Sequence, residues 1–257
     1  MIWQLGNSQT YILGSVHALQ EDGNKHLDAI DEIYEKANRL IFESDLDGDS
    51  GPIRYYENSS LAREISKKLF KDVKNEWRKC GIPYNELNQS KIWFAALLLN
   101  IYTGAKKGVL PEYGIDRTMW DRAKNDGKII EWLEDQTAGV SCFDSSPKGE
   151  QIEYLARAAR SKKDEFEKVE HIIESWQSSN TNALETVVQE HLVEYPKMYG
   201  CLLVERNKAW LNKIKEAIDN NECTIFVLGV LHCIGEESVL DLLLKNHSIT
   251  SELISSK

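Results

Sequence analysis

The sequence predicts an α/β (α+β) protein with a central mixed β-sheet, built from strand-loop-helix units at the two ends of the chain. A large helical insertion between these units forms a cap. Two observations carry this prediction. Residues 11–17 read YILGSVH and residues 226–232 read FVLGVLH, so an apolar strand ends in the same glycine-to-histidine phrase near each terminus. Between the two phrases, apolar residues recur mostly at helical spacing.

The first unit occupies the N-terminal 50 residues. Residues 9–16 have the apolar pattern of a strand whose regular part ends at Gly14. Residues 26–38 place apolar side chains on one face of a helix, and residues 39–46 (RLIFESDL) form a second buried strand. This order of elements predicts a right-handed βαβ crossover that lays the second strand beside the first.

In the middle of the chain, the sequence pattern predicts helices and one strand. We expect a helix from a serine cap near residue 59 to Gly81, because glycine commonly ends helices. From residue 147 to residue 221 the pattern predicts three or four helices with charged outer faces. The last of these helices covers about 197–219. The remaining predicted elements are helices over 85–108 and 114–127 and a strand over 128–134.

The C-terminal segment returns to the sheet. Residues 224–230 predict a strand, residues 236–245 a helix and residues 247–254 a short edge strand. The chain contains no low-complexity linker and no Pro/Gly-rich seam, which favours a single domain over residues 1–257. In that domain, residues 1–50 and 222–257 supply the halves of the sheet and residues 51–221 the helical insertion.

The composition restricts the partners. The chain has 31 basic and 41 acidic residues and a net charge of −10, which argues against nucleic acid, since that partner is bound through Lys and Arg. The longest apolar run, residues 92–102, is too short to span a bilayer. We therefore expect a peptide or small-molecule substrate, no nucleic acid and no membrane span. The sequence leaves a homo-oligomer open.

Cysteine usage and the N-terminus predict a cytoplasmic protein. The five cysteines are odd in number and form no CxxC pair, so we expect no disulfide framework, as in a reducing compartment. The first residues, MIWQLGNSQT, lack the basic and apolar regions of a signal peptide. Export of a longer precursor stays open.

Two histidines and one glutamate follow predicted strands. His17 and His232 come three residues after a glycine, and Glu43 comes at the end of the strand in residues 39–46. Ligands of open α/β sheets bind at the carboxyl ends of the strands. Two imidazoles and a carboxylate suit a divalent transition metal that keeps positions open for water. The alternative is that each histidine is an ordinary hydrogen-bonded loop residue; its repetition in the same phrase favours the site.

Other ionisable residues carry weaker signals. Glu134 ends a third predicted strand and is a weaker candidate for the same site. The thiol of Cys233 is expected to be packed in the interior, because neighbours along an extended segment point in opposite directions. Ordinary surface residues are expected at His26, His171, His191 and His247.

Five segments carry a family resemblance: GSVH (14–17), FES (42–44), YGID (113–116), LVERNKAW (203–210) and VLGVLHCIGEESVLDLL (227–243). In this order they resemble the TraB/PrgY/GumN family, which is grouped with the Tiki metalloproteases and, more distantly, with the erythromycin-esterase and ChaN-like proteins. The resemblance implies a metal-dependent hydrolase, peptidase-like in the Tiki branch, where manganese or cobalt supports activity.

The resemblance also implies site residues. The GxxH histidines correspond to His17 and His232, and the acidic strand end to Glu43. The ERN motif corresponds to Glu205, Arg206 and Asn207, and YGID contributes Gly114, Ile115 and Asp116. The chain departs from the family where Val230, Leu231 and Cys233 surround the second GxxH, and where no glutamine follows Leu133 and Glu134 at the family's position.

Roles can be assigned to these residues, with alternatives. Arg206 would orient Glu43 or bind a substrate carboxylate or oxyanion, and Asn207 would donate to the oxyanion. The alternative is that Glu205 and Arg206 are surface charges on an amphipathic helix. Asp116 is a candidate substrate-binding residue, although a carboxylate at a helix start is stabilising by itself. Tyr113 would line the same cleft.

The leading prediction is a metallohydrolase in which His17, Glu43 and His232 hold manganese, cobalt or zinc. Glu43 is predicted to be a ligand, with the role of general base as the alternative. The main rival is a haem-binding, peptide-binding or regulatory protein on the same scaffold, without hydrolytic activity.

Overall fold

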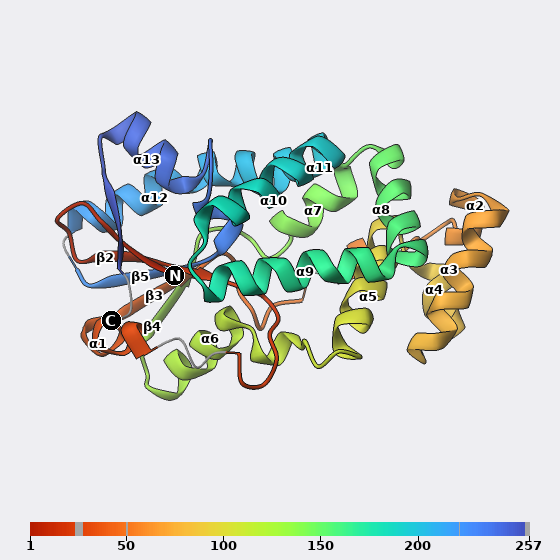
Figure 1. Cartoon of the computed structure of the whole chain (residues 1–257), viewed down its shortest axis with the longest axis horizontal. Helices are drawn as coiled ribbons and strands as arrows, with labels where there is room; N and C mark the ends of the chain where they lie inside the picture. Colours follow the sequence, from red (N-terminus) through yellow and green to blue (C-terminus); the bar gives the residue numbers. More distant parts are fainter. Residues whose placement is uncertain (24–27, 50, 221, 255–257) are drawn as a thin grey trace.

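The structure is a computed structural model that describes residues 1–23, 28–49, 51–220 and 222–254. A six-stranded sheet occupies one end of the molecule and a helical region extends away from it (Figure 1). The predicted α/β class with a mixed sheet is confirmed. The strands are β1 (Ile2–Leu5), β2 (Thr10–Ser15), β3 (Arg39–Phe42), β4 (Ile129–Trp132), β5 (Thr224–Gly229) and β6 (Ser251–Ile254).

The strand order is β4-β3-β5-β2-β1-β6. β4, β3, β5 and β2 are parallel, while β1 pairs antiparallel with both β2 and β6. The expectation that the crossover lays β3 beside β2 is wrong, because β5 lies between them: Leu13 of β2 and Phe42 of β3 both pair with Val227. The connection from β2 to β3 therefore skips one strand position in the sheet, and β5 occupies that position.

The central strand is covered on both faces. Every residue of β5 is buried, and its sequence, TIFVLG, does not alternate between apolar and polar residues, as is typical of a strand between two layers of helices. Helices α12 (Arg206–Asn220) and α13 (Val239–His247) lie above the sheet in Figure 1, and α1 (Asp28–Lys36) and α6 (Ile115–Asn125) lie below it.

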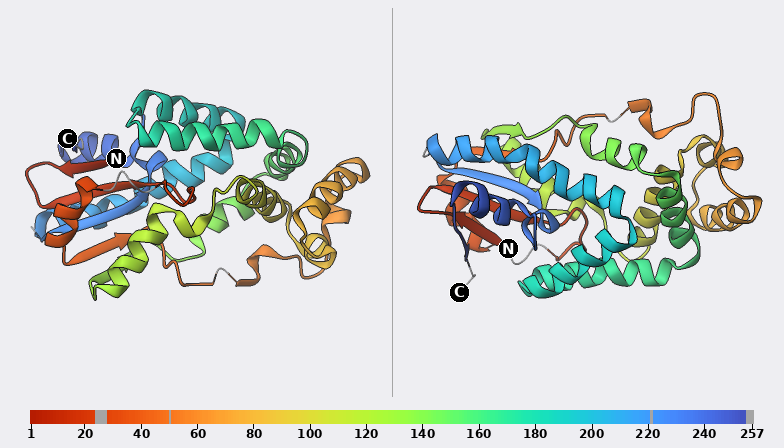
Figure 2. Two further views of the ribbon diagram at one scale, coloured as in Figure 1. Left: turned by 60° about the horizontal axis from the view of Figure 1, so that its bottom comes forward. Right: turned by 90° about the horizontal axis from the view of Figure 1, so that it is seen from above.

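The helical region extends the molecule along its long axis (Figure 2). It has a second hydrophobic core, in which Trp77 and Leu99 pack with Leu155. Its helices are α2 (Leu61–Glu64), α3 (Lys67–Cys80), α4 (Tyr84–Gln89), α5 (Ile92–Ala105), α7 (Ala138–Ser145), α8 (Lys148–Arg160), α9 (Lys162–Gln177), α10 (Thr181–Glu194) and α11 (Pro196–Tyr199).

Several predicted boundaries change. The helix expected from residue 59 to Gly81 is divided, because Ile65 is extended and the Ser66 side chain accepts from the Leu69 N–H to begin α3. Gly81 ends α3 in the left-handed conformation, as expected (φ 77°). Strand β1 and helix α7 were not predicted. The expected start of the first helix, residues 26–27, lies outside the described residues.

The last long helix changes its winding before Arg206. A π-helical segment, η3 (Gly200–Glu205), joins α11 to α12, so that residues 196–220 follow one helical path with an irregular register. Isolated π-helical turns of this kind are frequent at functional sites.

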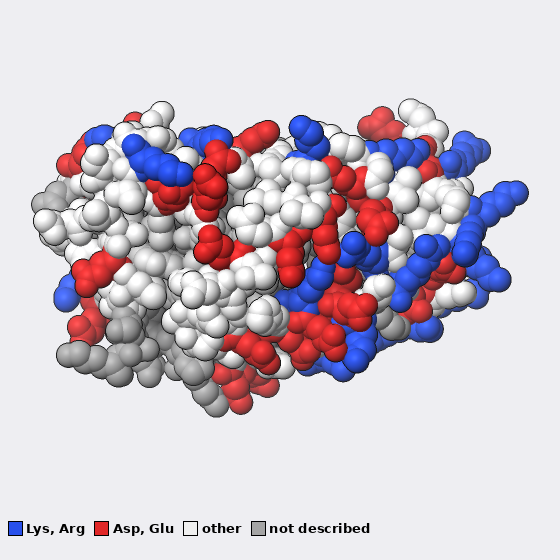
Figure 3. Space-filling view, turned by 45° about the horizontal axis from the view of Figure 1, so that its top comes forward, with Lys and Arg blue, Asp and Glu red and all other residues white. Residues whose placement is uncertain are grey.

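The surface has mixed charge. Basic side chains gather at the end of the helical region, where α3 carries Lys67, Lys68 and Lys71, and acidic side chains lie among them (Figure 3). No helix in the described part of the chain is long and apolar enough to cross a membrane.

Candidate active site

A cleft of about 540 Å³ lies at the carboxyl ends of β2, β3 and β5. His17, Glu43 and His232 all contribute to its wall, together with Glu134 and Arg206. The opposite wall is apolar and comes from helices α7 and α9 and from η3. The residues expected at three strand ends are therefore brought to one cleft, as the parallel arrangement of those strands requires.

His17 follows β2 and is held by Asp116. Its Nδ1 lies 3.0 Å from Asp116 Oδ2, and the negative charge of Asp116 raises the pKa of His17 to about 9. The side chain is 67% exposed, and it lines both the cleft and a neighbouring surface pocket that Asp116 also lines. With Nδ1 paired, Nε2 is the nitrogen that faces the cleft.

Close packing of the α6 N-terminus against His17 makes this pair possible. A Cβ on Gly114 would lie 2.4 Å from the carbonyl oxygen of His17, so only glycine permits the approach. The Ile115 N–H then donates to the Val16 carbonyl at 3.0 Å, and Asp116 follows in the first turn. The YGID motif therefore places the Asp116 carboxylate against His17.

His232 is buried, with 4% of the residue exposed. Its Nδ1 lies 2.6 Å from Asn207 Oδ1, while Asn207 Nδ2 donates to the Glu237 carbonyl at 2.9 Å. Since the amide oxygen can only accept, Nδ1 carries the proton, and the Nε2 lone pair accepts from Nη1 of Arg206 at 3.3 Å. Burial lowers the pKa of His232 to about 3, so the ring is neutral at ordinary pH. The ring packs against Trp210, with 4.6 Å between centroids.

Glu43 follows β3 and accepts two hydrogen bonds. The Gly229 N–H donates to Oε1 at 2.6 Å, and Nη2 of Arg206 donates to Oε2 at 2.7 Å. Burial by itself would raise the pKa of this carboxyl, but the positive charges of Arg206 and His17 together with the Gly229 N–H hold it well below its usual range. Glu43 is therefore a buried carboxylate that stays ionised.

Arg206 joins Glu43 to Glu134. Its Nε and Nη2 donate to Oε1 of Glu134 at 2.9 and 2.5 Å, and Trp210 Nε1 donates to Oε2 of Glu134 at 2.9 Å. Its Nη1 donates to the Leu202 carbonyl at 3.1 Å and lies 3.3 Å from His232 Nε2. Glu134, a weaker candidate in the sequence, is thus a full member of the site; its position after a strand was the signal.

The three predicted ligands surround one point beside Gly229. A Cβ built there would lie 3.1 Å from Glu43 Oε1, 3.3 Å from His17 Nε2 and 3.5 Å from His232 Cδ2. The two histidine rings are therefore on the same rim of the sheet, close to one carboxylate. Even so, no group of three or more His, Cys, Asp or Glu that could hold a metal ion is present among the described residues.

The other predicted residues have different surroundings. Tyr113 is half-buried and packs against the hydrophobic core, and it is not one of the residues that line the cleft. Asn207 is 2% exposed, and its contacts are the His232 ring and the Glu237 carbonyl. The structure thus shows Asn207 as a support of His232. Cys233 is buried, as expected.

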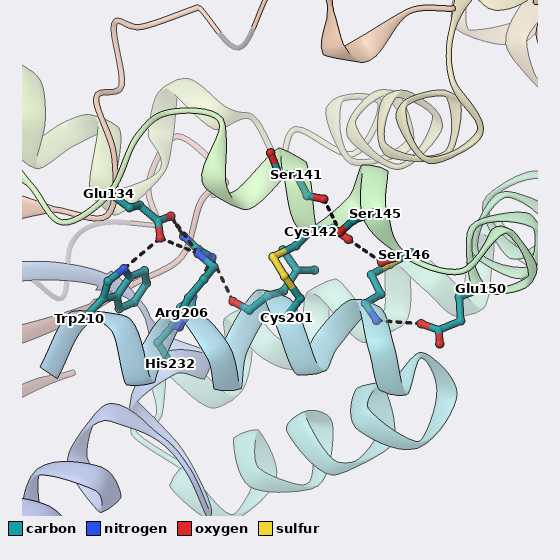
Figure 4. Close-up of a disulfide and its surroundings, with 12 residues drawn as sticks. Glu134, Ser141, Cys142, Ser145, Ser146, Glu150, Cys201, Arg206, Trp210 and His232 are labelled. Carbon is teal, nitrogen blue, oxygen red and sulfur yellow. Dashed lines mark hydrogen bonds and ion pairs between the residues drawn. A yellow bond between two sulfur atoms is a disulfide. The ribbon is translucent and has the colours of Figure 1, made fainter.

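A disulfide corrects the prediction from cysteine usage. Cys142 of α7 and Cys201 of η3 are bonded, which joins two elements of the apolar wall of the cleft a short distance from Arg206 (Figure 4). Neither the odd cysteine number nor the spacing of 59 residues indicated this pair. Disulfides are typical of oxidising compartments. Cysteine usage therefore no longer supports the prediction of a reducing compartment.

Comparisons with known proteins agree with the motifs. A model of the TraB/PrgY/gumN family matches residues 1–251. The proteins named "Uncharacterized protein YbaP" of Shigella flexneri and of Escherichia coli (strain K12) are each 21% identical over 240 residues, which cover 93% of this chain and 89% of theirs. No solved structure matches significantly. The family match spans nearly the whole sequence, and the chain belongs to the TraB/PrgY/gumN family.

Proposed function

We propose that the cleft is the active site of a metal-dependent, peptidase-like hydrolase, in which His17, Glu43 and His232 hold a divalent ion. One observation carries the proposal: in both histidines an acceptor occupies Nδ1 and Nε2 faces the cleft. Metal-binding histidines are commonly oriented in this way by a carboxylate or carbonyl on the second ring nitrogen. Asp116 has that position for His17 and Asn207 for His232.

The donor chemistry fits such an ion, although the described residues do not form a preassembled metal group. Two imidazole nitrogens and an ionised carboxylate suit manganese, cobalt or zinc. When bound, a divalent ion would lower the pKa of a bound water to about 7 and so supply hydroxide at neutral pH. Glu43 is the third ligand in this proposal, and the base that accepts a proton from water is its alternative role.

Arg206, Asp116 and His232 have further roles in this proposal. Arg206 keeps Glu43 ionised, and its guanidinium lies in the cleft wall, where a permanent positive charge stabilises a developing oxyanion. Asp116 raises the basicity of His17, so that ligand binding at Nε2 displaces a proton from this ring. His232 is already neutral, because burial keeps it so.

The test is metal analysis of the purified chain after incubation with manganese, cobalt or zinc and removal of the free ion. We expect one ion per chain in the wild type and in the control variant His171→Ala, which removes an exposed histidine of α9. We expect none in His17→Ala or His232→Ala, with circular dichroism unchanged. A wild type that holds no ion, or variants that keep it, would overturn the proposal.

A second candidate, ligand binding without hydrolysis, is favoured by the apolar walls of the cleft. Val140, Phe143 and Leu203 face the same space as the two imidazoles. The same protein preparation distinguishes this candidate: a Soret band after haem addition, absent in His17→Ala and accompanied by no divalent ion, would support haem binding.

A further inference from the structure

A second cavity, which we call the side pocket, adjoins the cleft. Its volume is about 280 Å³, and helices α5, α8, α9 and α10 supply most of its wall. The residues that line both the side pocket and the cleft are Ala18, Val169, Ile172, Tyr199 and Leu231. Whole small-molecule ligands occupy cavities of about 300 to 1,000 Å³, so the side pocket has room for one arm of a larger molecule.

The side pocket contains a carboxylate that is poorly compensated. The Glu165 side chain is 13% exposed, and the ion pair that the structure records for it, with Lys168 Nζ, is long at 3.8 Å. Lys168 Nζ is held instead by both carboxylate oxygens of Glu194 at 2.9 and 3.1 Å, and Arg157 Nη1 donates to Glu194 at 2.8 Å. The nearby cations therefore neutralise Glu194 more than Glu165.

The pKa of Glu165 reflects the same imbalance. Burial raises it above the ordinary value, and the positive charges of Lys168 and Arg157 do not offset burial together with the negative charge of Glu194. A cation bound next to Glu165 would stabilise its ionised form, and by linkage the ionised form would favour the cation.

A second polar group in the pocket also lacks a partner. His191 lines the side pocket, and its Nδ1 is fully buried with no hydrogen bond among the described residues. Burial lowers the pKa of His191 to about 4, so the ring adds no positive charge near neutral pH. The expectation that His191 is an ordinary surface residue is therefore wrong. Its ring stacks on Tyr199, with 4.3 Å between centroids.

Aromatic side chains complete the wall. Tyr154, Phe166 and Tyr199 all line the side pocket. The faces of aromatic rings attract ammonium and guanidinium groups, and their bodies bury aliphatic chains. A carboxylate, a neutral imidazole and aromatic rings together are suited to a cation on an aliphatic arm. Lys168 also lines the pocket, but its ammonium is paired with Glu194, which leaves Glu165 as the lining carboxylate that a cation would meet.

We propose that the side pocket binds a primary ammonium group on an aliphatic arm, such as a lysine-like side chain, with Glu165 as its counter-ion. As a statement about substrate, this rests on the proposed function: the arm would enter the side pocket while the scissile bond lies beside His17 and His232 in the cleft. The binding site itself depends only on the residues of the side pocket.

The test is a titration of the full chain with n-butylammonium, in which NMR monitors binding. We expect Glu165→Gln to weaken binding by about tenfold or more, the ~1.4 kcal/mol expected for one hydrogen bond to a charged group. Glu174→Gln, which removes an exposed carboxylate from the same helix, should leave binding unchanged. In the wild type, 1-butanol should bind far more weakly than n-butylammonium.

Equal affinity of wild type and Glu165→Gln, or equal affinity for 1-butanol and n-butylammonium, would overturn the proposal. The 1-butanol comparison needs no variant and so does not depend on Glu165→Gln folding. His17→Ala, which should lose the metal ion, should bind n-butylammonium as the wild type does. Failure of the metal proposal and failure of the side-pocket proposal are therefore separate results.

Discussion

Arg206 and Glu43 form a buried ion pair, with 2.7 Å between Nη2 and Oε2 and only 13% and 14% of the two side chains exposed. The pair connects the start of α12 to the end of β3, elements that are separated by most of the chain. Since the same guanidinium also binds Glu134, one cation is shared between two buried carboxylates. All three residues line the cleft, so the shared charge joins β3, the end of β4 and α12 at its wall.

Removal of the Arg206 charge should destabilise the protein strongly. Arg206→Met leaves Glu43 and Glu134 buried without their cation, and breaking a buried pair in this way costs about 3–5 kcal/mol. Urea unfolding gives the free energy of unfolding for comparison. Lys208→Met is the matched control, because Lys208 is 51% exposed in its pair with Glu237, and it should cost at most about 1 kcal/mol. Similar losses of unfolding free energy in both variants would show that the Arg206 pair contributes no more to stability than an exposed ion pair.

Asp116→Asn should lower the pKa of His17 from about 9 toward its ordinary value of 6.5. Because the folded pKa is raised, the stabilisation from this pair is fully present below pH 6.5 and is lost as the pH rises through about 9. The wild type should therefore lose this increment over that interval, and Asp116→Asn should not. NMR titration of the His17 ring measures the change directly; a midpoint still near 9 in the variant would exclude Asp116 as the cause.

Gly229→Ala should remove metal retention while the fold persists. The backbone of Gly229 (φ −51°, ψ 130°) suits any residue, but the added methyl would occupy the point 3.1 Å from Glu43 Oε1 and 3.3 Å from His17 Nε2. Small overpacking of this kind costs about 1–3 kcal/mol. Metal analysis and thermal melting give the two results. Gly149→Ala, where a Cβ meets nothing within 4 Å, should keep the ion. An alanine variant at Gly229 that still holds the ion would place the metal elsewhere.

Loss of the disulfide should lower stability and loosen the cleft. Cys142→Ser removes a crosslink over 59 residues, for which about 2–4 kcal/mol is typical. Urea unfolding under non-reducing conditions measures the change, and a reductant should reproduce it in the wild type. The control is Cys223→Ser, which changes a free cysteine and should respond to the reductant as the wild type does. Unchanged stability after reduction would contradict the crosslink.

The sequence predicted the strand ends and, through the family resemblance, an Arg206 that could orient Glu43, but it missed the contacts of Arg206 with Glu134. The GxxH phrases identify His17 and His232 because strand and histidine are adjacent in sequence, and Glu43 follows from the same local rule. The hydrogen bonds from Arg206 to Glu134 join residues 72 apart, which no local pattern indicates. The roles assigned to these residues remain predictions.

Long-range relationships account for the other errors. Neighbouring strands in sequence usually pair, so β3 was placed beside β2, but the buried sequence of β5 is better accommodated at the centre. Cys142 and Cys201 pair because α7 packs against η3, a contact that cysteine counting does not describe. The helix through residue 65 was predicted whole because its apolar spacing continues across the break.

The central place of β5 has a consequence for biosynthesis. β2 and β3 each need β5 as a neighbour, yet β5 begins only at Thr224, after the helical region has been made. A nascent chain that has not reached Gly229 exposes two unpaired strand edges, which attract other chains. The chain is thus expected to finish its sheet only late in translation, and premature termination before residue 224 should yield aggregated and not merely shortened protein.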